Sequence, residues 1–232
     1  MATHRDANPK TRPPLSRERV LRTAVALADE AGIGALSMRR LGHELGVEAM
    51  SLYNHVDGKD DILNGIVELV LGEIQLPSDQ ADWKEALRQT AISANEVFVR
   101  HPWACSLTLG RPSVSPPRTR WMESVLRTLR EAGFSPDLTH HAYHALDSHI
   151  TGFTLWQVSM PFDTKEELLD LAESFLRDIP ADEYPYVVEH AEQHIAPSNP
   201  EGKTEFEFGL DLILDGLERL RDAEARGAKR RS

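Results

Sequence analysis

Residues 41 to 56 of this chain read Leu41-Gly42-His43-Glu44-Leu45-Gly46-Val47-Glu48-Ala49-Met50-Ser51-Leu52-Tyr53-Asn54-His55-Val56. The apolar side chains at positions 41, 45, 47, 52 and 56 have the spacing of two short helices that share one inner face. Ser37 can cap the first helix, and Gly46 ends it, because glycine readily adopts the left-handed conformation that follows helices. The second helix, over Glu48 to Val56, therefore presents an outer face of hydroxyl, amide and imidazole groups.

A longer helix precedes this pair. Ser16 can act as its N-cap, and apolar residues then recur at helical spacing from Val20 to Ala31, until Gly32 ends the helix. Two short helices joined by a glycine-containing turn and packed on a longer helix form the helix-turn-helix plan. We therefore predict a DNA-binding head over residues 16–60, preceded by a flexible basic arm at residues 1–15.

The charge of the chain suits DNA at one end only. The formal net charge is −11, yet residues 1–60 hold 9 Lys and Arg against 8 Asp and Glu, which leaves 17 against 29 for residues 61–232. Within the first 22 residues, 6 basic side chains, among them Arg17 and Arg19, face 2 acidic ones. Because phosphates repel acidic surfaces, we expect nucleic acid to contact the N-terminal end alone.

Length and composition narrow the class of protein. A chain of 232 residues, 41% hydrophobic and 27% charged, can bury a sizeable core, and these values exclude wholesale disorder, collagen and coiled-coil fibres. No apolar run approaches the roughly 20 residues that a membrane helix needs, and the first fifteen residues lack the apolar core of a signal peptide. The single cysteine, Cys105, cannot form an internal disulfide or a cysteine-rich zinc site. We expect a cytoplasmic protein without a membrane partner.

Residues 61–225 show helical patterns only, so the predicted fold class is all-α. His101-Pro102 is interpreted as a helix breaker, and residues 111–117, with three prolines, as a loop. Thr164 and Glu167 form a capping-box pattern, and residues 226–232 form a basic tail. The helices are expected at Trp83–Val99, Arg118–Ala132, Pro136–Val158, Tyr186–Ile195 and Thr204–Ala225.

The sequence resembles the TetR family of bacterial transcriptional repressors. The motif that carries the resemblance is Leu45-Gly46-Val47, followed by Leu52-Tyr53-Asn54-His55-Val56 and Lys59. Further stretches resemble the C-terminal domain of the tetracycline-repressor type, namely 82–87, 100–103, 130–135 and 206–210. The resemblance covers residues 16 to 220. It implies a homodimer that binds a palindromic operator in double-stranded DNA and releases it when residues 61–225, the ligand-binding and dimerisation domain, bind a small-molecule effector.

The resemblance also assigns the residues that contact DNA. They are Arg39, Ala49, Met50, Ser51, Tyr53, Asn54, His55 and Lys59. Arg39 can fork onto a guanine, the alternative being an ordinary surface arginine, while Ala49, Met50 and the Tyr53 ring suit thymine methyl groups. His55 and Lys59 resemble phosphate contacts. Ala49-Met50 stands where the reference tetracycline repressor has Gln-Pro, so we expect a different operator.

Apolar and aromatic side chains with a few polar groups predict a pocket for a largely apolar effector, although ordinary core packing explains each residue individually. The expected lining is Asn95, Trp103, Leu107, Thr108, Trp121, Val125, His149, Phe153, Trp156 and Gln157, with Tyr143 as a further candidate. In tetracycline repressors a histidine before a Leu-Gly pair binds the drug's magnesium ion, and Thr108 holds that position here. We therefore predict no metal, no cofactor and no response to tetracycline.

A second interpretation remains open, in which His140, His141 and His144 act with Asp147 as the ligands of a helical-bundle metalloenzyme. The i, i+3 and i, i+4 spacing of these histidines suits a metal, but equally a polar helix face. The sequence contains no Gly-x-Ser-x-Gly, no phosphate-binding glycine loop and no His-Glu-x-x-His. We therefore predict that the chain is not an enzyme.

Two predictions concern assembly and switching. Helices 136–158 and 204–225 are the candidates for a four-helix bundle between two subunits. The second of them carries an apolar stripe of Ile213, Leu214, Leu217 and Leu220. The segment Asp60 to Gln75 joins the head to the pocket helices, which makes it the expected lever between effector and operator.

Overall fold

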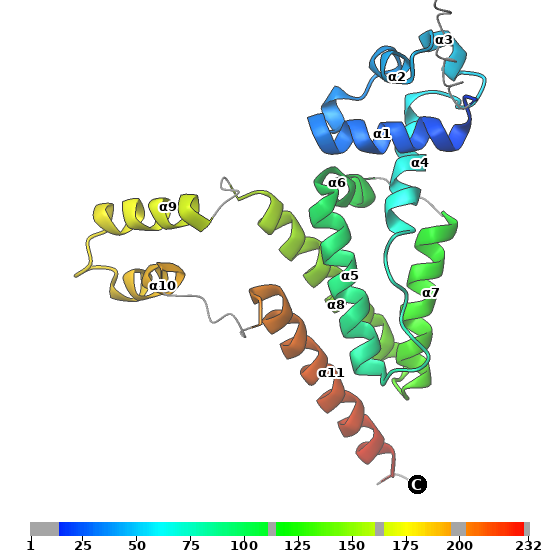
Figure 1. Cartoon of the computed structure of the whole chain (residues 1–232). Helices are drawn as coiled ribbons and strands as arrows, with labels where there is room; N and C mark the ends of the chain where they lie inside the picture. The colour runs from blue at the N-terminus through cyan, green and yellow to red at the C-terminus, as the bar shows by residue number, and fades with distance from the viewer. Residues whose placement is uncertain (1–13, 111–114, 161–164, 196–202, 230–232) are drawn as a thin grey trace, which may run out of the picture. The chain divides into compact units, whose positions relative to one another are not determined.

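The computed structural model describes residues 14–110, 115–160, 165–195 and 203–229, which form helices joined by short connections (Figure 1). No strand occurs in this part of the chain, which confirms the all-α class. Its helices include none that is long and apolar enough to cross a membrane. The chain divides into two compact units, Met1–Glu73 with Ser106–Thr119, and Ile74–Cys105 with Arg120–Ser232.

The first unit contains the expected helix-turn-helix. Its elements are α1 (Arg17–Ala31), the 3-10 turn η1 (Ile33–Ala35), α2 (Met38–Leu45), α3 (Ala49–Leu52) and α4 (Lys59–Leu71), with α1 packed on both α2 and α4. The hydroxyl of Ser16 accepts a hydrogen bond from the Arg19 amide, and that of Ser37 from the Arg40 amide, so both predicted N-caps are confirmed. Helix α3 ends at Leu52, earlier than the predicted segment, and a turn follows it.

The close approach of α2 to α3 depends on glycine. Gly46 ends α2 in the left-handed conformation at φ 69°, and the Val47 amide donates to the Gly42 carbonyl at 2.9 Å. A Cβ atom at Gly42 would lie 2.9 Å from the Val47 carbonyl oxygen and 3.2 Å from the Ala49 Cα atom. Behind this contact the side chains of Leu41 and Leu52 are fully buried. Backbone atoms cannot move aside as a flexible side chain can, so the position requires glycine.

An ion pair fixes the start of α4 in the same unit. Arg17 Nη1 lies 2.5 Å from Asp61 Oδ2, and Arg17 Nη2 lies 2.8 Å from Asp61 Oδ1. The Asp57 amide also donates to Asp61 at 3.0 Å. The hydrogen bond from Arg17 holds the pKa of the Asp61 carboxyl below its usual value. Arg17, expected to neutralise DNA phosphates, therefore joins the beginnings of α1 and α4.

The second unit is built around α5 (Trp83–Arg100), which packs against both α8 (Pro136–Val158) and α11 (Glu205–Lys229). Its other helices are α9 (Lys165–Asp178) and α10 (Pro185–Ile195), which pack on each other (Figure 1). Helix α7 (Pro116–Glu131) lies mainly in this unit. The division between the units falls inside α6 (Pro102–Gly110), between Cys105 and Ser106.

The helix break predicted at His101-Pro102 is confirmed, since α5 ends at Arg100; Pro102 then takes the first position of α6, where a proline has no amide hydrogen to lose from the helix. Two other predicted boundaries were wrong. The loop predicted over residues 111–117 ends too late, because α7 begins at Pro116. Helix α11 extends to Lys229, into the predicted tail. Other predictions lie outside the described residues, namely the arm at residues 1–13, the loop at 111–114, the capping pattern at Thr164 and the last three residues of the tail.

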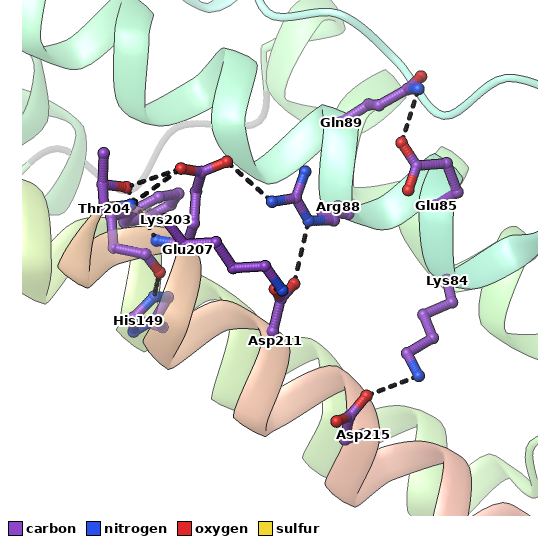
Figure 2. A network of polar contacts seen from close by, with 11 residues as sticks. Lys84, Glu85, Arg88, Gln89, His149, Lys203, Thr204, Glu207, Asp211 and Asp215 are labelled. Carbon is purple, nitrogen blue, oxygen red and sulfur yellow. Dashed lines mark hydrogen bonds and ion pairs between the residues drawn. The ribbon is translucent and has the colours of Figure 1, made fainter. Parts of the chain in front are cut away.

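Paired charges join α5 to α11 (Figure 2). Arg88 binds Glu207 at 2.8 Å and Asp211 at 3.0 Å. Lys84 binds Asp215 at 2.6 Å, and its hydrogen bond to that carboxylate lowers the pKa of Asp215. The contacts recur at helical spacing along α11, so they fix which face of that helix turns toward α5.

The predicted apolar stripe on α11 was wrong for two of its four residues. Leu214 and Leu217 are 0% and 6% exposed in the single chain, so they pack inside their own subunit. The opposite face of the helix leaves Phe208, Leu212 and Leu220 between 54% and 61% exposed. These three residues, rather than Leu214 and Leu217, are therefore the apolar surface that α11 can offer to a second copy of the chain.

We expect Gly42→Ala to destabilise the head by about 1–3 kcal/mol, the usual cost of an extra methyl group in a filled space. Gly34→Ala is the matched control, since a Cβ atom there meets nothing within 4 Å. Thermal unfolding and DNA binding of both variants check this. Equal stability of the two variants would show that α2 and α3 can separate without loss.

We expect the double variant Leu212→Glu, Leu220→Glu to be monomeric in sedimentation experiments, because four carboxylates would meet at a two-fold interface. Met122→Glu is the control, since Met122 is 42% exposed on α7 and belongs to a different surface. A double variant that sediments as wild type would rule out this face of α11 as the subunit contact.

Candidate DNA interface and effector cavity

The predicted DNA-contacting residues all lie in the first unit, on α2, on α3 and the turn after it, and at the start of α4. Met50 is 75% exposed and Tyr53 49% exposed. Arg39, Asn54 and Lys59 are also exposed, whereas Ala49, Ser51 and His55 are half-buried. Leu52 and Val56, interpreted as core, are buried. Their burial fixes α3 so that the residues between them turn outward.

The charges of this unit fall into two groups. Arg17 and Arg22 are neutralised by Asp61 and Glu18 within the unit. By contrast, no described acidic group lies within ion-pair distance of Arg39 or Lys59. An uncompensated cation on an exposed surface can replace a counterion at a phosphate or fork onto a guanine. Arg39 and Lys59 are therefore among the cations that this surface can offer to DNA.

The second unit contains a cavity between α5, α7 and α8. Its empty space measures about 300 Å³ and is partly open to solvent, but it is narrow, with room for roughly one water molecule. The described lining residues are Leu87, Thr90, Ala91, Trp121, Val125, Tyr143, Leu146, Asp147 and Ile150. Most of this wall is apolar, as is usual for sites that bind small organic molecules.

Two residues that line the cavity each carry a buried polar atom without a partner. Trp121 is 5% exposed and Thr90 is 2% exposed, and neither the indole Nε1 nor the threonine Oγ1 forms a hydrogen bond within the described chain. A buried donor without a partner costs about 1–3 kcal/mol, so native structures contain few of them. Two of them on residues that line one small cavity mark it as a place where a polar group of a ligand can bind.

Of the ten predicted effector contacts, Trp121 and Val125 line this cavity. Asn95 and Gln157 instead bind each other at 3.3 Å, and Asn95 also donates to Thr154 Oγ1 at 2.8 Å, which joins α5 to α8. Trp103 is buried beside the ring of His101, with the ring centres 6.1 Å apart.

The remaining predicted contacts lie elsewhere. His149 stacks on Phe206 at 4.9 Å between ring centres, and its Nε2 is 2.9 Å from the Phe206 carbonyl oxygen (Figure 2). Phe153 packs against the same pair of rings, and Trp156 is 52% exposed. Leu107 and Thr108 lie on α6 among residues grouped with the first unit. An effector contact by these residues stays a prediction.

Tyr143, the further candidate, also lines the cavity, but the sequence analysis missed six lining residues: Leu87, Thr90, Ala91, Leu146, Asp147 and Ile150. Those on α5 and those on α8 each recur at intervals of three or four residues, so the helical pattern could have shown that they share a face. It could not show that the space beside that face is incompletely filled.

The described residues give no support to the metalloenzyme interpretation. His140, His141 and His144 are exposed, and no group of three or more His, Cys, Asp or Glu side chains in this part of the chain is placed to hold a metal ion. Burial raises the pKa of the Cys105 thiol to about 11, so the thiol stays protonated at neutral pH. Its Sγ donates to the Thr151 carbonyl at 3.8 Å, consistent with a packing role.

Comparison with known proteins identifies the family. The model of bacterial regulatory proteins of the tetR family matches residues 20–66, and that of the tetracyclin repressor-like C-terminal domain matches residues 76–221. The chain belongs to the TetR family. Among its relatives, the HTH-type transcriptional repressor DrrR1 of Streptomyces coeruleorubidus is 32% identical over 90% of this chain and 79% of that protein. The class C tetracycline repressor from Escherichia coli is 30% identical over 89% and 92%.

Solved structures of this family agree with the fold. Apo ActR from Streptomyces coelicolor superposes with a TM-score of 0.74 at 28% identity, over 91% of this chain and 99% of ActR. ActR has also been solved in complex with actinorhodin, and that structure superposes with a TM-score of 0.72.

Proposed function

We propose that this TetR-family chain represses transcription by placing α2 and α3 on an operator, and that it releases the operator when a largely apolar effector enters the cavity between α5, α7 and α8. The observation that carries the proposal is the combination of an exposed helix-turn-helix bearing unpaired cations with a cavity in the other unit that is lined by residues with unpartnered buried donors. Neither catalysis nor a metal cofactor is part of this function.

Operator recognition follows from the exposed residues of the first unit. Two heads in a homodimer read two half-sites about one helical turn or slightly more apart, so the operator is a near-palindrome. Arg39 supplies base contact, whereas Lys59 and His55 position the head on phosphates. Met50 and Ala49 offer methyl and methylene surface, which suits thymine rather than the edge of an adenine.

Effector response follows from the narrowness of the cavity. A ligand larger than one water molecule must displace α5, α7 or α8, since the free cavity does not accommodate it. ActR, a relative with ligand-bound structures, supports assigning an organic effector to this domain. The coupling between effector and operator is typically about 1–3 kcal/mol and acts equally in both directions. The chain passes from the first unit to the second at residues 73–74, directly after α4, so α4 is the proposed lever.

Selection of bound DNA from a random pool tests the first half of this proposal and should recover a near-palindrome. We then expect Arg39→Ala to lose about 1–3 kcal/mol at the preferred base, while Lys59→Ala, which removes the same charge, weakens all sequences alike and reduces the salt dependence. Binding measured on the operator and on single-base variants separates the two effects. Unchanged base preference in Arg39→Ala would remove that residue from direct readout.

Tetracycline with magnesium tests the nature of the effector. Thr108 is 6% exposed and accepts a hydrogen bond from Arg118 through its carbonyl at 3.0 Å, and its side chain offers no imidazole to a metal ion. We expect the operator complex to persist in a mobility-shift assay under conditions that release the class C tetracycline repressor. Strong release, or a response abolished by EDTA, would contradict the assignment of a metal-free effector.

A further inference from the structure

The chemistry of the cavity wall defines the effector more narrowly, on the basis of the function proposed above. We propose that the effector is a neutral, mainly apolar molecule that carries a ketone-type or amide-type carbonyl, and that its oxygen accepts hydrogen bonds from Trp121 Nε1 and Thr90 Oγ1. Three observations carry this inference: the conformation of Thr90, the donor-only character of the indole, and the lack of a cation in the described wall.

Thr90 differs from most helical threonines whose hydrogen bonds are described. Four of them donate to the carbonyl four residues earlier, at 2.6 to 2.9 Å: Thr23 to Arg19, Thr128 to Ser124, Thr151 to Asp147 and Thr154 to Ile150. Thr90 lies inside α5 and lines the cavity, and it could do the same, yet its Oγ1 is buried and has no partner in the described chain. Its hydroxyl is therefore free to donate to a ligand.

Trp121 fixes the polarity of the ligand group. An indole N–H can only donate, so its partner must be an acceptor. Trp121 lines the cavity from α7, and Thr90 lines it from α5. Residues with unpartnered donors on two different helices thus line one narrow space, and a carbonyl oxygen, with its two lone pairs, is a group that can accept from two donors.

The rest of the wall excludes a charged acceptor. None of the described lining residues is a lysine, arginine or histidine. A ligand carboxylate would therefore enter a poorly solvated space whose described wall offers no cation to pair with, which is unfavourable. Leu87, Ala91, Val125, Leu146 and Ile150 supply the apolar remainder. A neutral carbonyl on an apolar skeleton satisfies both parts of the wall.

Matched pairs of small molecules test the proposal. 9-Fluorenone and fluorene share one skeleton and differ by C=O against CH₂, and 1-tetralone and tetralin form a smaller pair of the same kind. We expect each ketone to bind the full-length protein about tenfold more tightly than its hydrocarbon, as expected for a hydrogen bond to a buried donor. With ¹⁵N-labelled tryptophan, the Trp121 indole proton, assigned by its loss in Trp121→Phe, should move downfield with the ketone alone.

Variants separate this role from simple packing. Trp121→Phe and Thr90→Val keep most of the buried surface but lose the donors, so both should reduce the preference for the ketone. Thr139→Val is the matched control: Thr139 is also buried and unpartnered, but it does not belong to the described wall. Both threonine variants should unfold at wild-type temperature or above, because each removes an unsatisfied hydroxyl.

The outcomes are decisive for the proposal. Equal binding of ketone and hydrocarbon, a preference that survives in Trp121→Phe, or binding of neither member of either pair would each overturn it. Operator binding is measured separately on the same samples without ligand. A protein that binds its operator but does not prefer ketones disproves the carbonyl site alone, whereas failure to bind any selected DNA disproves the proposed function.

Discussion

The charge pairs between α5 and α11 determine how the second unit can work. Arg88 and Lys84 hold carboxylates on successive turns of α11, so one face of that helix is turned toward α5 and its opposite face outward. The inward face brings Leu214 and Leu217 into the core, and the outward face leaves Phe208, Leu212 and Leu220 exposed. Each exposed or half-buried pair contributes little free energy, so the network acts mainly by fixing rotation. Helix α11 covers one side of α5. The other sides of α5 pack against α8 and line the cavity.

The sequence predicted the first unit well because its signals are local. Caps at Ser16 and Ser37, the glycine after α2 and the spacing of Leu41, Leu45 and Leu52 each act within a few residues. The N-cap of α11 has the same local character, since Thr204 and Glu207 exchange hydrogen bonds in a capping box. The break at His101-Pro102 was predicted for the same local reason, but the helix that begins at Pro102 was not, because it depends on the residues beyond the proline.

The candidate effector site was predicted less well, because a cavity is a property of packing between helices. Trp121 and Val125 could be named from their type and position, but Thr90 resembles any helical threonine in sequence. His149 shows the reverse case. Its polar side chain suggested ligand contact, yet it stacks on Phe206, and a Cβ atom at Gly209 would lie 2.6 Å from its Cε1 atom. The pairing of a histidine on α8 with a glycine on α11 depends on the register of two helices, which periodicity within one helix does not contain.

If the effector binds in this cavity, as proposed, the narrowness of the cavity sets the kinetics of effector entry. Because the free site has room for roughly one water molecule, a ligand binds only while the lining helices are apart, and its apparent affinity is lowered by the fraction of time that they are. If opening precedes binding, the observed association rate levels off at high ligand concentration, at the rate of opening. A cell with such a regulator would respond less to a brief pulse of effector than to a sustained one. The narrow cavity would thus make the response depend on how long the effector is present.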